Sequence, residues 1–385
     1  MKFLRKLLKY TLIIVGLLVI LLYILDYDYL LKAVRTIYLS GHTTAYLEDY
    51  KKFDNRTIES GIIQPWPNHQ KYNSIKETDV LRTTNKTYGT VAFVIIKNDS
   101  IWFENYYDGY DNTTKSNSFS MAKSMVTSML GKAIMEGKIE SLDQPVGDFF
   151  KEFSKGKAAQ LTVGDLASMA SGLNWDESYY SPFSITTRAY FYDDLETMML
   201  GVKVVDDPGQ SYKYLSGNTQ LLGMVIEKAT GQTLSNYLSS KFWKPLGAGQ
   251  DAFWQIDSEN NGLEKAYCCV ASTALDFARF GKLYKDYGSW KGEQLLDSAF
   301  VQKSVTARFA ESPVYGYGWW LHKKDGKSLF LMRGHLGQMV IVDRANDIII
   351  VRLGHRRKLQ KHVGEFADDV DVYIEEAYKM LNSSN

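Results

Sequence analysis

The sequence is poor in cysteine and proline and has no excess of charge, and each shortage excludes a class of protein. Its 385 residues include two cysteines and seven prolines, and 45 basic residues nearly balance 44 acidic ones. A nucleic-acid-binding protein normally has a strong basic excess, which is missing here. So few prolines exclude a collagen-like or Pro-rich chain. The charged fraction of 23% is close to average and argues against a wholly disordered chain.

The two cysteines, Cys268 and Cys269, are neighbours in the sequence. Adjacent cysteines seldom bridge, because their geometry is far from the preferred disulfide separation. We therefore expect two buried free thiols and no disulfide framework. The six histidines show no zinc-binding spacing, so we expect neither a metal nor another cofactor.

One long apolar segment lies near the N-terminus. It has no charge from Thr11 to Leu25 and follows a basic leader that contains Lys2, Arg5, Lys6 and Lys9. About 20 apolar residues cross a bilayer, and basic residues before the span favour a cytoplasmic N-terminus. We predict a single-pass signal-anchor over residues 1–25 in the cell (inner) membrane, with the rest of the chain exported to the periplasmic side. A cleaved signal peptide is the alternative, although no small-x-small cleavage site follows Leu25.

In the exported part we predict a stem over residues 26–75 that packs on a single domain, residues 76–385. Apolar, β-branched runs predict strands at 91–97, 101–107, 317–322, 328–332, 338–343 and 348–353, and Asn98-Asp99-Ser100 is the predicted turn between the first two. Helical periodicity dominates from about 120 to 300 and again over 363–381. We therefore predict an α+β fold in which N- and C-terminal strands share one antiparallel sheet, flanked by helices, with an inserted helical lobe.

The segment Ser120-Met121-Ala122-Lys123 opens a strongly apolar helical pattern. Residues i and i+3 share a helix face, so the Lys123 amine can reach the Ser120 hydroxyl. Burial and the helix N-terminus both lower the pKa of such an amine, which makes it a plausible base. The alternative is an ordinary helix N-cap at Ser120, with Lys123 extending to the surface.

The order of further motifs favours the catalytic interpretation. After Ser120 come the segments 161–166, 169–175, 212–223, 315–320 and 334–338. This series resembles the penicillin-recognising, β-lactamase-related serine hydrolases, and within them the class C-like esterase and 6-aminohexanoate-dimer hydrolase branch. The resemblance covers about residues 76–385 and implies a β-lactamase/transpeptidase-like fold.

The resemblance also implies a role for each matching residue. Ser120 would be the nucleophile, Lys123 its activating base, and Tyr214 a phenolate or hydrogen-bond relay that passes the proton to the leaving group. The backbone amides of Ser120 and Gln338 would form the oxyanion hole. The remaining matches imply substrate contacts at His335, Gly337, Tyr179 and Trp175.

Two departures from the family pattern shape the expected activity. Ser216 stands where the family's Tyr-x-Asn element has asparagine, although Asn218 lies two residues on, and no Lys-Thr-Gly or Ser-Asp-Asn occurs. We therefore expect cleavage of a small ester, amide or peptide substrate through an acyl-enzyme. The alternatives are a D-amino-acid peptidase or weak β-lactamase acting on cell-wall-type substrates, and a non-catalytic, membrane-tethered binding protein.

Overall fold

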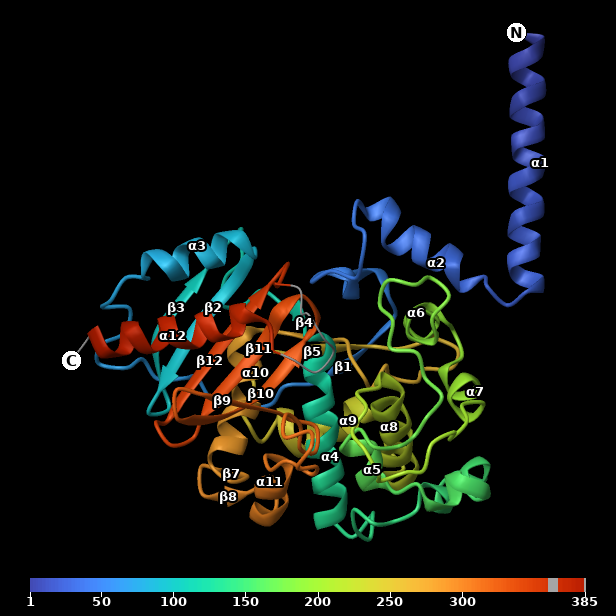
Figure 1. Ribbon diagram of the computed structural model, residues 1–385. Helices are drawn as coiled ribbons and strands as arrows, with labels where there is room; N and C mark the ends of the chain where they lie inside the picture. Colours follow the sequence, from blue (N-terminus) through green and yellow to red (C-terminus); the bar gives the residue numbers. More distant parts are fainter. Residues whose placement is uncertain (359–365, 384–385) are drawn as a thin grey trace.

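A six-stranded antiparallel sheet forms the centre of one lobe in the computed structural model, which describes residues 1–358 and 366–383 (Figure 1). Its strand order is β3-β2-β12-β11-β10-β9. The strands are β2 (Thr90–Lys97), β3 (Ser100–Tyr106), β9 (Trp320–Lys324), β10 (Lys327–Gly334), β11 (Gln338–Asp343) and β12 (Ile348–Gly354). N- and C-terminal strands thus meet where β2 pairs with β12.

Helices cover both faces of this sheet, and the strands are apolar on both faces for that reason. Along β2, Phe93 and Ile95 pack toward α3 (Asp79–Thr87) and α12 (Asp368–Ser383). Val94 and Ile96 point to the opposite face, toward α10 (Ala274–Lys285) and α4 (Ala122–Met135). This alternation follows from the two-residue period of a strand.

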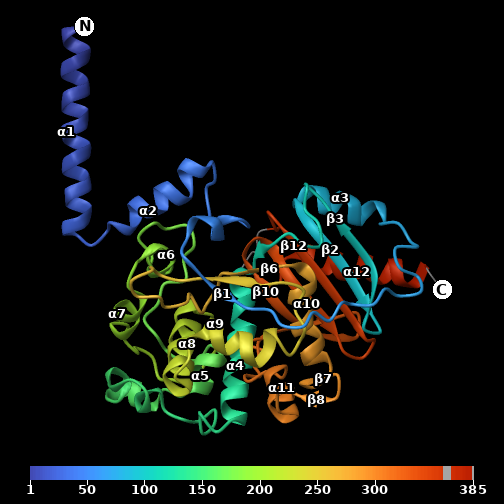
Figure 2. The ribbon, with the colours of Figure 1, turned by 180° about the vertical axis from the view of Figure 1, so that it is seen from behind.

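A mainly helical lobe is inserted between β3 and β9, and α4 runs between it and the sheet (Figures 1 and 2). It contains α5 (Val163–Ala167), α6 (Ile185–Phe191), α7 (Leu195–Leu200), α8 (Ser216–Thr230) and α9 (Leu234–Leu238). Helix α11 (Ser298–Ser304) lies on the sheet side of α4 (Figures 1 and 2). A second sheet of order β1-β5-β6-β4 joins β1 (Asn55–Ile58), β5 (Ala252–Gln255), β6 (Val270–Ser272) and β4 (Ser116–Asn117). A short hairpin of β7 (Ser289–Trp290) and β8 (Glu293–Gln294) completes the list.

The N-terminal helix α1 (Lys2–Ile24) projects away from the rest of the molecule (Figure 1). It has the length and composition to cross a membrane, with a mean hydropathy of 2.5 and no buried residue, a combination that a signal sequence shares. Helix α2 (Tyr29–Thr36) then lies along the helical lobe beside α6. Strand β1 follows and pairs with β5, so the segment 26–75 contributes directly to the second sheet.

The α+β class, the antiparallel sheet and the inserted helical lobe are confirmed. The predicted turn at Asn98 and Asp99 has both residues at positive φ, 48° and 59°, as the tight hairpin between β2 and β3 requires. The second sheet was not predicted, because its strands are two to four residues long and carry no clear alternation. The predicted C-terminal helix begins at Asp368, and residues 359–365 lie outside the described part of the chain.

Candidate active site

Ser120 lies in a 3-10 turn (Phe119–Met121) that leads directly into α4. Strand β4 fixes this turn from one side, because Ser118 N–H donates to the Val270 carbonyl at 2.7 Å. Phe119, immediately before the serine, has φ of 46°, a left-handed conformation that costs energy for a non-glycine residue. Strain of this kind is frequent at functional sites, since it holds a reactive side chain in one orientation.

Lys123, the second residue of α4, is buried with its Nζ 3.0 Å from Ser120 Oγ. Its other two hydrogen bonds reach Ser216 Oγ at 3.2 Å and the Tyr267 carbonyl at 2.8 Å. Burial lowers the pKa of Lys123 to about 8, and the negative charge of Glu177 partly opposes that shift. About a tenth of the amine is therefore neutral at pH 7, directly beside the serine hydroxyl.

Tyr214 lies beside this pair, with the centre of its ring 5.2 Å from Lys123 Nζ. Its ring packs against Trp320 and Tyr315 from the sheet lobe, with centroids 5.1 and 6.0 Å away. Burial is the main cause that raises the pKa of Tyr214 above that of a free phenol. The hydroxyl is therefore protonated at neutral pH and can both donate and accept a hydrogen bond.

A carboxylate that the sequence did not reveal completes this network. Glu177 accepts hydrogen bonds from Ser216 N–H and Ser216 Oγ, both at 2.6 Å. Ser216 is the first residue of α8, where a negative charge is stabilised by the helix dipole. A continuous chain of hydrogen bonds thus runs from Glu177 through Ser216 and Lys123 to Ser120. Asn218 lies two residues after the position at which the family pattern has asparagine. Its side chain instead accepts a hydrogen bond from Ser171 Oγ and donates one to the Met169 sulfur in the core.

The segment His335–Gly337 forms a tight turn between β10 and β11 on the opposite side of the site. The guanidinium of buried Arg352 donates to the carbonyls of Leu336 and Gly337, both at 2.9 Å, and so fixes this turn. A Cβ at Gly337 would lie 2.5 Å from Arg352 Nη1, so only glycine fits there. The N–H of Gln338 donates to the His335 carbonyl in the same turn.

The rings of His335 and Tyr179 stack on one another beside the site, with centroids 5.7 Å apart. Burial, with a contribution from the Arg357 charge, lowers the pKa of His335 to about 4, so its imidazole is neutral at physiological pH. Tyr179 donates a hydrogen bond to Glu177. Trp175, in contrast, is buried beneath Gly217 and donates to Thr186 Oγ1 at 2.8 Å, so the structure does not bring it to the site.

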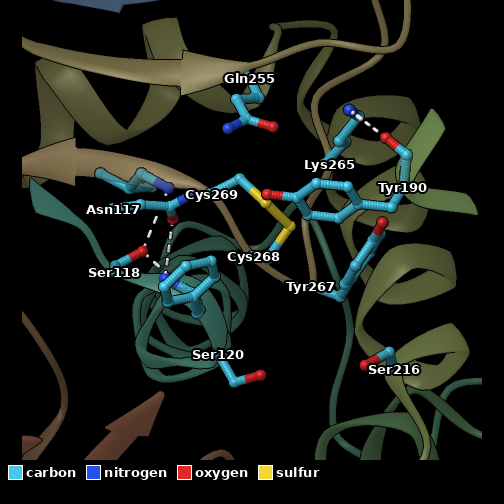
Figure 3. Close-up of a disulfide and its surroundings, with 12 residues drawn as sticks. Asn117, Ser118, Ser120, Tyr190, Ser216, Gln255, Lys265, Tyr267, Cys268 and Cys269 are labelled. Atoms are coloured by element: carbon cyan, nitrogen blue, oxygen red, sulfur yellow. Dashed lines mark hydrogen bonds between the residues drawn. A yellow bond between two sulfur atoms is a disulfide. The ribbon is translucent and has the colours of Figure 1, made fainter. Parts of the chain in front are cut away.

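Cys268 and Cys269 form a disulfide, and the prediction of two free thiols was wrong. Disulfides between neighbouring residues are rare, and nothing in the sequence marks this pair as an exception. Figure 3 shows the bridge above Ser120, with Tyr267 beside it. It directly precedes β6, which pairs with the strand before Ser120, and it directly follows Tyr267, whose carbonyl binds Lys123.

A largely apolar cavity of about 360 Å³ opens beside the nucleophile. Ser120, Ser216, Tyr267 and Cys268 line its inner end, and His335 and Tyr179 line one side. Its outer wall is formed by residues of α2 and α6. The cavity therefore joins the candidate catalytic group to the segment that follows α1.

Comparison with protein-family models matches residues 79–372 to the Beta-lactamase model. The chain belongs to the β-lactamase family. Among curated relatives, the 6-aminohexanoate-dimer hydrolase of Paenarthrobacter ureafaciens is 25% identical over 287 residues, covering 69% of this chain and 72% of that protein. Protein flp of Staphylococcus aureus (strain COL) is 25% identical over 196 residues, 48% of this chain, and the match spans only 39% of that protein. The chain is thus a hydrolase of the β-lactamase-related serine type.

Solved structures share this family's fold. A Bacillus anthracis protein assigned as a 6-aminohexanoate-dimer hydrolase superposes with a TM-score of 0.70 at 19% identity, covering 86% of this chain and 91% of its own. A penicillin binding protein from Bacillus halodurans gives a TM-score of 0.58 at 17% identity, covering 78% of this chain and 100% of its own. At these identities the likeness establishes the fold of the β-lactamase-family chain, not its substrate.

Proposed function

We propose that this protein is a membrane-anchored serine hydrolase that cleaves an ester or amide bond through an acyl-enzyme on Ser120. The observation that carries the proposal is the buried Lys123 amine, 3.0 Å from Ser120 Oγ and with a pKa lowered to about 8. A base with a pKa near the working pH combines a useful neutral fraction with adequate proton affinity.

In the acylation step, Ser120 Oγ attacks the substrate carbonyl carbon while Lys123 Nζ takes the hydroxyl proton. The tetrahedral intermediate then collapses, the bond to the leaving group breaks, and the leaving group receives a proton. Water attacks the resulting ester in a second step and regenerates Ser120. Each step needs a group that accepts a proton from the attacking oxygen and a group that delivers a proton to the departing one.

Tyr214 acts in this scheme as a relay, because its raised pKa disfavours a phenolate. Its hydroxyl accepts a hydrogen from one partner as it donates its own to the leaving group. Lys123 is therefore the better candidate for the base, and Tyr214 for the group that completes proton transfer.

The backbone amides of Ser120 and Gln338 are proposed to bind the developing oxyanion. The Gln338 N–H already donates to the His335 carbonyl, so a substrate oxygen would share or replace that bond. The turn held by Arg352 makes such a position rigid, which favours electrostatic stabilisation without reorganisation.

The scissile bond is proposed to belong to a linear amide or ester rather than to a β-lactam. The relative from Paenarthrobacter ureafaciens is named for hydrolysis of the 6-aminohexanoate dimer. In place of a lysine, the turn before β11 presents His335, whose lowered pKa leaves it neutral and unable to pair with a substrate carboxylate.

The basic residues in the first part of α1 support a cytoplasmic N-terminus, with residues 1–25 as the anchor and the catalytic domain on the exported side. The intact mass of the mature protein tests the anchor, because a start beyond Leu25 would indicate cleavage. An added glycosylation or protease site in the domain tests the orientation.

A fluorophosphonate probe tests the catalytic proposal. Wild-type protein should become labelled and Ser120→Ala should not, while both unfold at the same temperature. Equal labelling of the two proteins would refute the proposal. A fluorescent penicillin should give no stable adduct under conditions in which esters turn over, and a stable adduct on Ser120 would instead favour a peptidase.

A further inference from the structure

The outer wall of the cavity beside Ser120 is built from the helix that joins the candidate anchor to the domain. Leu30, Ala33, Val34 and Ile37, three of them within α2, all line the cavity. These positions recur at helical spacing, so one apolar face of α2 is turned toward the nucleophile. Lys32 and Arg35 lie off this face and line a separate, polar pocket beneath α1.

The same segment must lie close to a membrane if α1 spans one. Its apolar part from Leu7 to Ile24 has 18 residues with Lys9 as the one charge, and gives about 27 Å at 1.5 Å per residue, close to a hydrocarbon core of about 30 Å. Only four residues separate α1 from α2, and they reach at most about 18 Å when extended. Val34, Tyr38 and Leu39, toward and beyond the far end of α2, are exposed, and Val34 and Tyr38 also line the cavity.

The cavity also has the size of a medium-length hydrocarbon chain. An apolar cavity of about 150 Å³ is known to hold benzene, so one of 360 Å³ has room for on the order of ten carbons. Tyr214, which we propose serves the leaving group, is not among the lining residues. The cavity therefore lies on the acyl side of the scissile bond.

We propose that this cavity binds the acyl chain of a medium-chain ester or amide that enters from the membrane surface beneath α2. This inference rests on the proposed function. Ser120 Oγ forms the new ester with the acyl carbon, the bond to the polar leaving group breaks, and the proton from Ser120 passes to that group. The acyl chain stays in the cavity until water releases it as a carboxylic acid.

Chain-length selectivity of the full-length protein in detergent is the first test. We expect kcat/KM for p-nitrophenyl esters to rise from acetyl to octanoyl by at least about 100-fold, since each buried methylene contributes roughly a factor of four. A flat series, with acetyl ester still hydrolysed through Ser120, would overturn the acyl-chain proposal alone. Absence of any Ser120-dependent hydrolysis would instead refute the proposed function.

Two matched substitutions on α2 test whether the acyl chain of the substrate binds in this cavity. Ala33→Phe fills the cavity, so the octanoyl-to-acetyl ratio should fall at least about tenfold. Leu31→Phe adds a ring on the same helix but outside the cavity lining, and its ratio should equal that of wild type. Equal ratios for Ala33→Phe and Leu31→Phe would mean that the chain binds elsewhere. Circular dichroism establishes that both variants are folded.

Tyr267 distinguishes an apolar chain from a polar occupant. Its hydroxyl is buried and lacks a hydrogen-bond partner within residues 1–358 and 366–383, and the residue lines the cavity. Tyr267→Phe removes this unpartnered group, so the octanoyl-to-acetyl ratio should rise. A marked fall would show that the occupant carries a polar atom at that point and would overturn the proposal.

The source of the substrate is tested in phosphatidylcholine vesicles that contain a 4-methylumbelliferyl laurate ester. Protein reconstituted into the same vesicles should hydrolyse this ester faster than an equal amount of protein in separate, ester-free vesicles. Equal rates in the two arrangements would show uptake from water and would overturn entry from the membrane.

Discussion

Replacing Glu177 by glutamine should move the pH dependence of hydrolysis to lower pH. Glu177 faces Lys123 through Ser216, by hydrogen bonds of 2.6 and 3.2 Å, so the carboxylate lies within about 6 Å of Nζ. Its negative charge stabilises the ammonium and raises the pKa of Lys123 against the effect of burial. At 6 Å this attraction amounts to about 0.7 kcal/mol in a water-like dielectric and about 3 kcal/mol at an effective dielectric of 20. Removing it should lower the pKa by roughly 0.5 to 2 units.

The measurement is kcat/KM for an acetyl ester against pH, with hydrolysis by Ser120→Ala subtracted. Because the neutral amine is the active form, the wild-type rate should rise with pH through about 8. In Glu177→Gln the midpoint of that rise should lie at a lower pH than in wild type. Glu293→Gln, an exposed change in the distant β8 strand, should leave the midpoint in place. An unchanged or higher midpoint in folded Glu177→Gln would refute the assignment of Lys123 as the base coupled to Glu177.

Three further predictions concern the network around the site. Lys123→Met should lower kcat by about 10³ yet stabilise the protein at pH 7, because burying the ammonium costs about 3 kcal/mol. A destabilised variant in urea titration would contradict this. Arg352→Leu should lower the free energy of unfolding by about 2–4 kcal/mol, since the carbonyls around Gly337 lose their donor; a loss below about 1 kcal/mol would count against it. Alkylation in denaturant should label Cys268 and Cys269 only after reduction, as judged by intact mass, and labelling without reduction would refute the bridge.

The parts of the fold that local sequence patterns encode could be predicted. The β2–β3 hairpin was recognisable from a β-branched run and its turn, and α4 and α8 from their apolar spacing. That N- and C-terminal strands share one antiparallel sheet was also predicted, and the pairing of β2 with β12 is where they meet. Ser120 and Lys123 could be paired because one helical turn brings them together.

What the sequence did not reveal depends on contacts between distant segments. Glu177 lies in an irregular loop, and its contact with Ser216 bridges 39 positions that no local period links. The cavity arises only when α2 packs against the helical lobe. Trp175 belongs to a motif next to the site, but the close approach of Gly217 turns its ring into the core.

The pairing of β1 with β5 has a practical consequence for anyone who expresses this protein in pieces. The family match begins at residue 79, whereas the second sheet begins with β1 at Asn55. A fragment trimmed to the family match would lose β1 and leave β5 as an unpaired edge, a surface on which strands of other molecules can add. Recombinant fragments should therefore start before α2, and poor solubility of shorter ones would reflect where they were cut rather than instability of the catalytic lobe.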